Sequence, residues 1–135
     1  MKIIADSNVL LRAILDDHPV QSPLAQAALQ NAELVAISLP TLCEFVWSLQ
    51  RGYKRKHADV VSALRALLDT ANIVLDKPAV EAGIALAEAG GDFADGVITF
   101  DGRRLGGMHL ATFDREAARL ISDEGFDTML LGEQS

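Results

Sequence analysis

The chain has 135 residues and a formal net charge of −7, and half of its residues are hydrophobic. This length predicts one domain over residues 1–135, and the charge argues against tight non-specific binding to nucleic acid, which depends on Lys and Arg neutralising phosphates. No apolar run approaches the ~20 residues of a membrane span and no signal-peptide pattern is present, so we expect a cytoplasmic protein without a membrane segment.

The first stretch, Met1–Val9, reads MKIIADSNV and combines a short apolar run, an acid and a helix start. The three apolar residues before Asp6 are too few for a helix, so they predict a buried strand. A helix should begin at Ser7 and end near residues 16–17. Parallel α/β sheets bind ligands beyond the carboxyl ends of their strands, which is where Asp6 lies, although Asp is also a favoured helix cap.

The rest of the chain alternates helical and strand patterns. The predicted helices cover about residues 23–31, 40–50, 57–68, 78–89 and 92–100, with a last one from 115. The predicted strands are 34–37, 73–75, 108–112 and 127–131, and DGRRLGG at 101–107 is expected to be a loop. This alternation predicts an α/β fold with a parallel sheet and helices on both of its faces.

Three of these helices have apolar faces that we expect to be buried. The expected inner residues are Leu24, Ala27, Ala28 and Leu29 in the first, Leu42, Phe45, Val46 and Leu49 with Cys43 and Trp47 in the second, and Phe93, Val97 and Ile98 in the third. The second helix also carries Glu44, next to Trp47 on the helical wheel.

Acidic residues recur at the ends of strands and the starts of helices. Asp114 repeats the strand–acid–helix pattern of Asp6, and acids that follow neighbouring parallel strands would lie close together. Asp92 and Asp95 are three residues apart at a helix start, so they share one face. Helix capping is the alternative role for each of these aspartates.

Taken together, the acids predict a metal site. Carboxylates that converge repel one another and raise their own pKa values, and a divalent cation removes that conflict. An all-oxygen set without His or Cys suits Mg²⁺ or Mn²⁺. Such a site is suited to activating water for attack on a phosphodiester.

Four motifs in order resemble those of PIN-domain ribonucleases, and within them the VapC toxins of toxin–antitoxin pairs. They are IADSNVLLRAIL at 4–15, Glu44 within PTLCEFVWSL, DFADGVI at 92–98 and ATFD at 111–114. The resemblance implies a three-layer α/β/α PIN-like domain with a central, mainly parallel sheet. It also implies a metal-dependent endoribonuclease that acts on RNA as a toxin, forms a homodimer and is paired with a VapB-type antitoxin. The negative charge suits an antitoxin with basic segments, for which the helix at 40–50 is a candidate contact.

The resemblance also maps the family's acidic quartet onto this chain, at Asp6, Glu44, Asp95 and Asp114. Asp92 is a possible fifth ligand, and Glu116 stands where many relatives have a further Asp. Ser7, Asn8 and Thr112 lie beside the acids and either orient them and bind water or serve as simple caps. Arg12 and Arg115 are candidate RNA contacts, as are Arg51, Lys54, Arg55 and Lys56.

Two other functions remain open. A non-enzymatic phosphoacceptor signalling domain would also have a parallel sheet with acids at strand ends, and Asp76 would be its acceptor. That function requires a second acid beside Asp6, where this chain has Ser7. It also gives no role to Glu44 and Asp95. The other alternative is a PIN-like binding domain without catalytic activity.

Overall fold

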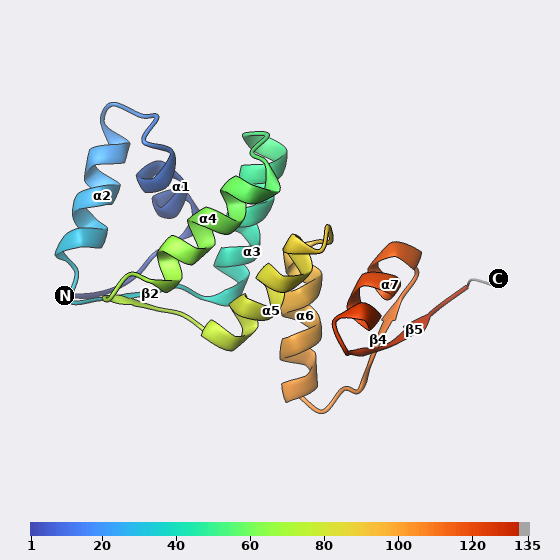
Figure 1. Cartoon of the computed structure of the whole chain (residues 1–135). Helices are drawn as coiled ribbons and strands as arrows, with labels where there is room; N and C mark the ends of the chain where they lie inside the picture. The colour runs from blue at the N-terminus through green and yellow to red at the C-terminus, as the bar shows by residue number, and fades with distance from the viewer. Residues whose placement is uncertain (133–135) are drawn as a thin grey trace. The chain divides into compact units, whose positions relative to one another are not determined.

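The computed structural model describes residues 1–132, which form two compact units (Figure 1). Unit 1 is Met1–Lys77, and unit 2 is the rest of the described chain from Pro78. Both contain parallel strands and helices, so the predicted α/β class with parallel strand pairing is confirmed. Within the described residues, no helix combines the length and the apolar character needed to cross a membrane.

Unit 1 contains a three-stranded parallel sheet in the order β1-β2-β3. Its register pairs Ile3 with Val35 and Val35 with Ile73. Its elements are β1 (Lys2–Ile4), α1 (Ser7–Leu15), α2 (Gln21–Asn31), β2 (Leu34–Ala36), α3 (Leu39–Trp47), a π-helical turn (Ser48–Gly52), α4 (His57–Leu68) and β3 (Ile73–Val74).

The core of unit 1 uses the apolar stripe predicted for α3. Its predicted inner residues, Leu42, Phe45, Val46 and Leu49, are all buried, as are Leu10, Val35, Val60 and Leu64 from other elements. Because this stripe is buried, only the exposed side of the helix is left for the partner contact that we expected, which stays a prediction. Trp47 is instead 63% exposed, so its predicted burial is wrong.

The predicted burial of the first strand is wrong for Ile4, which is 84% exposed. Successive side chains of a strand point to opposite faces of the sheet. The face that carries Val35 and Ile73 is buried, whereas Ile4 and Val74 lie on the other face and are exposed. A continuous apolar run therefore did not reveal which side of the strand the core covers.

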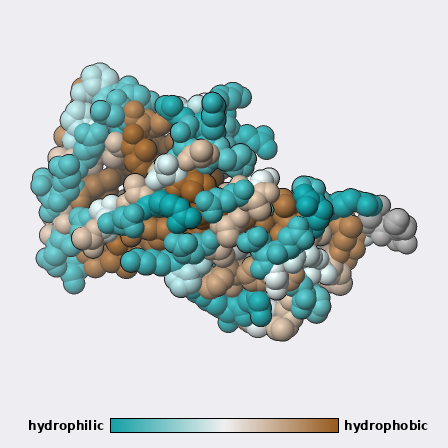
Figure 2. Space-filling view, viewed as in Figure 1, coloured by the Kyte–Doolittle hydropathy of each residue, from teal (hydrophilic) through white to brown (hydrophobic). Residues whose placement is uncertain are grey.

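Helix α2 starts two residues earlier than predicted and turns a different face inward. The His18 Nδ1 atom accepts hydrogen bonds from the backbone N–H groups of Val20 and Gln21, at 3.2 and 2.9 Å, so the helix begins before Pro23. Ser22 and Ala25 are buried, whereas Leu24, Ala27 and Ala28 are exposed, contrary to the prediction. Figure 2 shows hydrophobic side chains at the surface of unit 1 in the region of α1, α2 and α4.

Unit 2 contains a two-stranded parallel sheet with its own core. Leu86, Leu120 and Ile121 are buried together, with Leu110 and Phe126 packed against them. The elements are α5 (Lys77–Glu88, which begins at the unit boundary), α6 (Phe93–Arg104), β4 (His109–Thr112), α7 (Arg115–Asp123) and β5 (Asp127–Leu130).

Helix α6 differs from the prediction in its length and in one face. It continues to Arg104, so the first half of the predicted loop is helical. Phe93 and Val97 are buried as predicted, but Ile98 is 57% exposed. Residue 98 lies one position beyond the 93–97 stripe, and a rotation of about 100° per residue turns it away from that face.

Two glycines let α5 and α6 approach each other closely. A Cβ atom on Gly96 would lie 2.7 Å from the carbonyl oxygen of Ala82, and one on Gly83 would lie 2.6 Å from the ring of Phe93. Only glycine fits at such distances, so these positions allow the backbones to meet. Asp95 is the neighbour of Gly96, and this packing fixes its place in unit 2.

Candidate functional site

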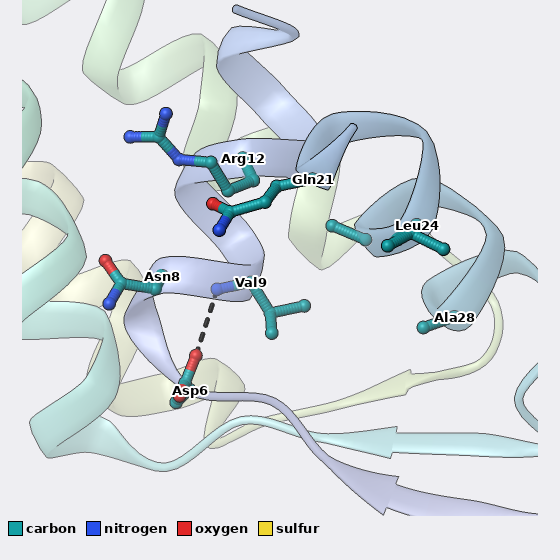
Figure 3. A pocket seen from close by; sticks show the side chains of 8 residues that line it. Asp6, Asn8, Val9, Arg12, Gln21, Leu24 and Ala28 are labelled. Atoms are coloured by element: carbon teal, nitrogen blue, oxygen red, sulfur yellow. Dashed lines mark hydrogen bonds between the residues drawn. The ribbon is translucent and has the colours of Figure 1, made fainter. Parts of the chain in front are cut away.

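Asp6 lies two residues after β1 and caps α1. Its Oδ1 atom accepts a hydrogen bond from the backbone N–H of Val9 at 2.9 Å (Figure 3). The carboxylate is exposed at the carboxyl end of the strand, as the sequence predicted. Capping engages one carboxylate oxygen, which leaves a second oxygen on the same side chain for another partner.

Asp6 also lines a cavity of about 480 Å³ in unit 1. Its polar lining comes from Asp6, Asn8, Arg12 and Gln21, and its apolar lining comes from Val9, Leu24, Ala25 and Ala28. In Figure 3 the guanidinium of Arg12 points away from the Gln21 amide, and Leu24 and Ala28 lie on the other side of the view. The exposed residues of α2 thus form a wall of this cavity.

Arg12 is held by two neighbours. Its guanidinium donates to Asp17 Oδ1 at 3.0 Å and to the hydroxyl of Tyr53. The guanidinium carbon also lies 5.9 Å from the centre of the Tyr53 ring. These contacts connect α1 to the segment that follows α3, and they leave Arg12 as one charged group of the cavity.

Glu44 lies on the exposed side of α3, opposite the buried stripe. Trp47 is three residues further on and is exposed as well, so the two side chains share one face of the helix. Glu44 is therefore accessible, as a metal ligand or a solvated residue would be.

Asp92 and Asp95 occupy the first turn of α6 in unit 2. The Oδ1 atom of Asp92 accepts from the backbone N–H of Ala94 at 3.2 Å, so Asp92 is the N-cap. Asp95 is half-buried, and its pKa is raised, chiefly by burial and then by repulsion from the charges of Asp92 and Asp114. The backbone carbonyl of Asp95 accepts from the Thr99 hydroxyl at 2.8 Å.

Asp114 repeats the arrangement of Asp6. It lies two residues after β4, and its Oδ1 atom accepts from the backbone N–H of Ala117 at 3.1 Å. The Thr112 hydroxyl oxygen accepts from the backbone N–H of Asp114 at 3.0 Å, which fixes the turn that presents the acid. Both roles predicted for Thr112, orienting the acid and simple capping, are compatible with this bond.

Glu116 is engaged away from these acids. Arg119 donates two hydrogen bonds to its carboxylate, and these bonds hold the pKa of Glu116 below its usual value. Arg115, a predicted RNA contact, is exposed at the first position of α7.

Three of the predicted acids in unit 2 interact electrostatically. The negative charges of Asp92 and Asp114 both raise the pKa of Asp95. In residues 1–132, no three His, Cys, Asp or Glu side chains form a group close enough to hold a metal ion. The donor chemistry nevertheless suits a hard cation, because Asp92, Asp95 and Asp114 repel one another and offer oxygen donors, which match Mg²⁺ or Mn²⁺.

Asp6 follows β1 of unit 1 and Asp114 follows β4 of unit 2, so the expectation that the two acids end neighbouring strands stays a prediction. Within unit 1 β1 pairs with β2, and within unit 2 β4 pairs with β5. A short apolar run predicts a strand but carries no information on its partner, because pairing is decided by contacts distant in sequence.

Gln21 and Tyr53 were not predicted as part of any site. Gln21 lines the cavity beside Asp6, and Tyr53 holds Arg12. The only local feature that could have placed Gln21 in the helix is the sequence HPVQS at 18–22. Its His18 ring accepts a hydrogen bond from the backbone N–H of Gln21, the first residue of α2. No local signal pairs Tyr53 with Arg12, which is 41 residues away.

An α/β fold with parallel strands, and with an acid two residues after β1 and after β4, is typical of the class of proteins that bind ligands beyond the carboxyl ends of their strands. The family model described as PIN domain matches residues 3–121, so the chain belongs to the PIN domain family. Its α/β architecture is consistent with a PIN-like three-layer α/β/α fold. PIN domains are generally nucleases that use divalent metal ions. No curated protein matches the chain.

Proposed function

We propose that this protein is an endoribonuclease that depends on Mg²⁺ or Mn²⁺ and acts as the toxin of a toxin–antitoxin pair. Membership of a family of nucleases supports hydrolysis of a phosphodiester bond and does not favour a phosphoacceptor signalling domain. The toxin role follows from the resemblance of the four acidic motifs to those of VapC proteins. We place its action in the cytoplasm, where its RNA substrate is found.

The observation that carries the proposal is the raised pKa of Asp95. Burial and the charges of Asp92 and Asp114 make the ionised form of Asp95 costly. Carboxyl groups with perturbed pKa values are concentrated at functional sites, and a bound cation relieves repulsion between them. The raised pKa therefore favours a functional role for these acids over capping alone.

The proposed ligands are Asp6, Glu44, Asp95 and Asp114, as in the family's acidic quartet, with Asp92 as a possible addition. A bound Mg²⁺ or Mn²⁺ would supply an activated water and stabilise charge on the phosphate oxygens. Backbone N–H donors at the helix starts hold the capping carboxylates in place. Ser7, Asn8 and Thr112 would orient the acids or nearby water, and Arg12 and Arg115 would meet phosphates.

Cleavage of total cellular RNA by purified variants tests this function. Asp6→Asn, Asp95→Asn and Asp114→Asn should each reduce cleavage by at least about 100-fold, because each removes a charged oxygen ligand. Asp92→Asn should lose less, because Asn caps a helix about as well as Asp. EDTA should stop the reaction.

Asp76→Asn is the control that separates the alternatives. A nuclease should cleave normally with this change, whereas a phosphoacceptor domain would lose its essential residue. Full activity of Asp6→Asn, or cleavage that survives EDTA, would contradict the mechanism. A wild-type chain that binds RNA without cutting it would support the inactive binding domain instead.

A further inference from the structure

Trp47 is the single tryptophan of the chain and its indole is largely exposed. Tryptophan is large and apolar, so it is usually well buried, and an exposed one commonly marks a binding surface. Trp47 lies one helical turn after Glu44 on the exposed side of α3, beside a proposed active-site acid.

A basic segment follows Trp47 directly. Four of the twelve Lys and Arg residues of this acidic chain lie within positions 51–56, namely Arg51, Lys54, Arg55 and Lys56, and all four are exposed. Arg55 shares a cavity of about 260 Å³ with Asp59, so the other three are the more available cations. The segment is at the end of the α3–α4 pair, where Figure 2 shows a hydrophilic surface.

The backbone of this segment is held in one conformation. After the π-helical turn, the N–H of Tyr53 donates to the carbonyl of Ser48 at 3.1 Å, and that of Arg55 donates to the carbonyl of Leu49 at 2.9 Å. Lys54 has a left-handed φ of 55°, and the Tyr53 hydroxyl accepts from Arg12. The basic side chains therefore project from a fixed frame, and π-helical turns are frequent at functional sites.

We propose that Trp47 and the segment 51–56 form a binding surface for single-stranded RNA, in which the indole stacks on a base and Arg51, Lys54 and Lys56 contact phosphates. An aromatic platform beside clustered cations is the chemistry that binds unpaired nucleic acid without sequence preference. Charge complementarity selects this occupant, because a polyanion matches a local cluster of cations on a protein of net charge −7. The proposal rests on the proposed function and names the residues that place its substrate beside Glu44.

Intrinsic fluorescence tests the stacking directly, because all indole emission comes from Trp47. The full chain is titrated in EDTA, where no cleavage is expected, with an unstructured oligouridylate. Binding should quench the emission, and its affinity should fall as salt rises.

Anisotropy of a labelled oligouridylate then compares variants. Trp47→Ala should weaken binding about tenfold, and Trp47→Phe should recover much of the loss, because phenylalanine still stacks. Lys54→Gln and Lys56→Gln should each reduce the slope of log affinity against log salt by about 0.7. Lys2→Gln and Leu105→Ala remove an exposed charge and an exposed apolar side chain elsewhere and should leave binding unchanged.

The outcomes separate this inference from the proposed function. If the wild type cleaves RNA with Mn²⁺ but Trp47→Ala binds and cleaves equally well, the surface is wrong and the nuclease stands. If binding depends on Trp47 but no RNA is cut, the surface stands and the nuclease fails. If Trp47→Ala changes only the oligomeric state or the capture of a protein partner, Trp47 belongs to a protein interface and the inference is overturned.

Discussion

Three of the predicted metal ligands, Asp6, Asp92 and Asp114, are also helix caps. Each uses its Oδ1 atom to accept a backbone N–H from the first turn of its helix. Such bonds fix the orientation of the side chain. Capping and metal binding are therefore compatible, because the cap orients a charged group before any ligand arrives.

At the residue scale, Asp95 makes stability depend on pH. Its pKa is raised in the folded chain, so above its ordinary pKa the folded state retains a proton that the unfolded state loses. Stability should therefore fall as pH rises through the interval between the two pKa values, and the full penalty remains at neutral pH. Asp95→Asn removes this penalty, so in EDTA at neutral pH it should be at least as stable as the wild type.

Urea denaturation from acidic to neutral pH measures this effect. Asp101→Asn, at a partly exposed acid on the same helix, is the matched control and should retain the wild-type pH dependence. A wild-type stability that rises across this interval while Asp95→Asn stays flat would show that the sign is wrong.

At the scale of elements, the crossing of α5 and α6 depends on Gly96. Gly96→Ala would place a Cβ atom 2.7 Å from the backbone carbonyl oxygen of Ala82, so the helices must separate. We expect a loss of about 1–3 kcal/mol in the free energy of unfolding. Thermal or urea denaturation measures the change.

Gly102 is the matched position on the same helix. A Cβ atom there meets nothing within 4 Å, so Gly102→Ala should stabilise α6 by about 0.5–1 kcal/mol. Opposite signs for the two substitutions would identify close approach as the reason for Gly96. Equal effects would mean that helix propensity alone accounts for both.

At the scale of the whole molecule, the proposed metal should raise the thermal stability of the chain. A ligand that binds only the folded state stabilises it by about 2.7 kcal/mol at 100 times its dissociation constant. The melting temperature should therefore rise with added Mn²⁺ in the wild type and in Asp101→Asn. Asp6→Asn and Asp95→Asn should show little rise, and an equal rise in all four proteins would contradict the ligand assignment.

The proposed assembly is tested by expression with the product of the adjacent gene. We expect the chain to form a homodimer and to co-purify with a VapB-type antitoxin whose basic segments complement its negative charge. Light scattering of the purified sample gives the stoichiometry. A monomer that binds no protein encoded next to it would argue against the toxin role while leaving the nuclease activity open.

The sequence alone determined the local features of this protein. Helix α4 has the predicted bounds, and both Asp6 and Asp114 begin helices directly after strands. These features depend on apolar periodicity and on capping groups a few residues away. Both can be recognised in the amino-acid sequence alone. The α/β class and the PIN family follow from the same order of elements and acids.

The tertiary structure decided which faces are buried and which elements meet. Leu24, Trp47 and Ile98 are apolar, yet they are exposed, because burial depends on what packs against a helix. Strand pairing, the contact of Arg12 with Tyr53 and the close crossing at Gly96 join residues far apart in the chain. The raised pKa of Asp95 likewise needs burial together with two neighbouring charges, one of them from another helix. Such properties arise only once the chain has folded, because no local pattern encodes a distant neighbour.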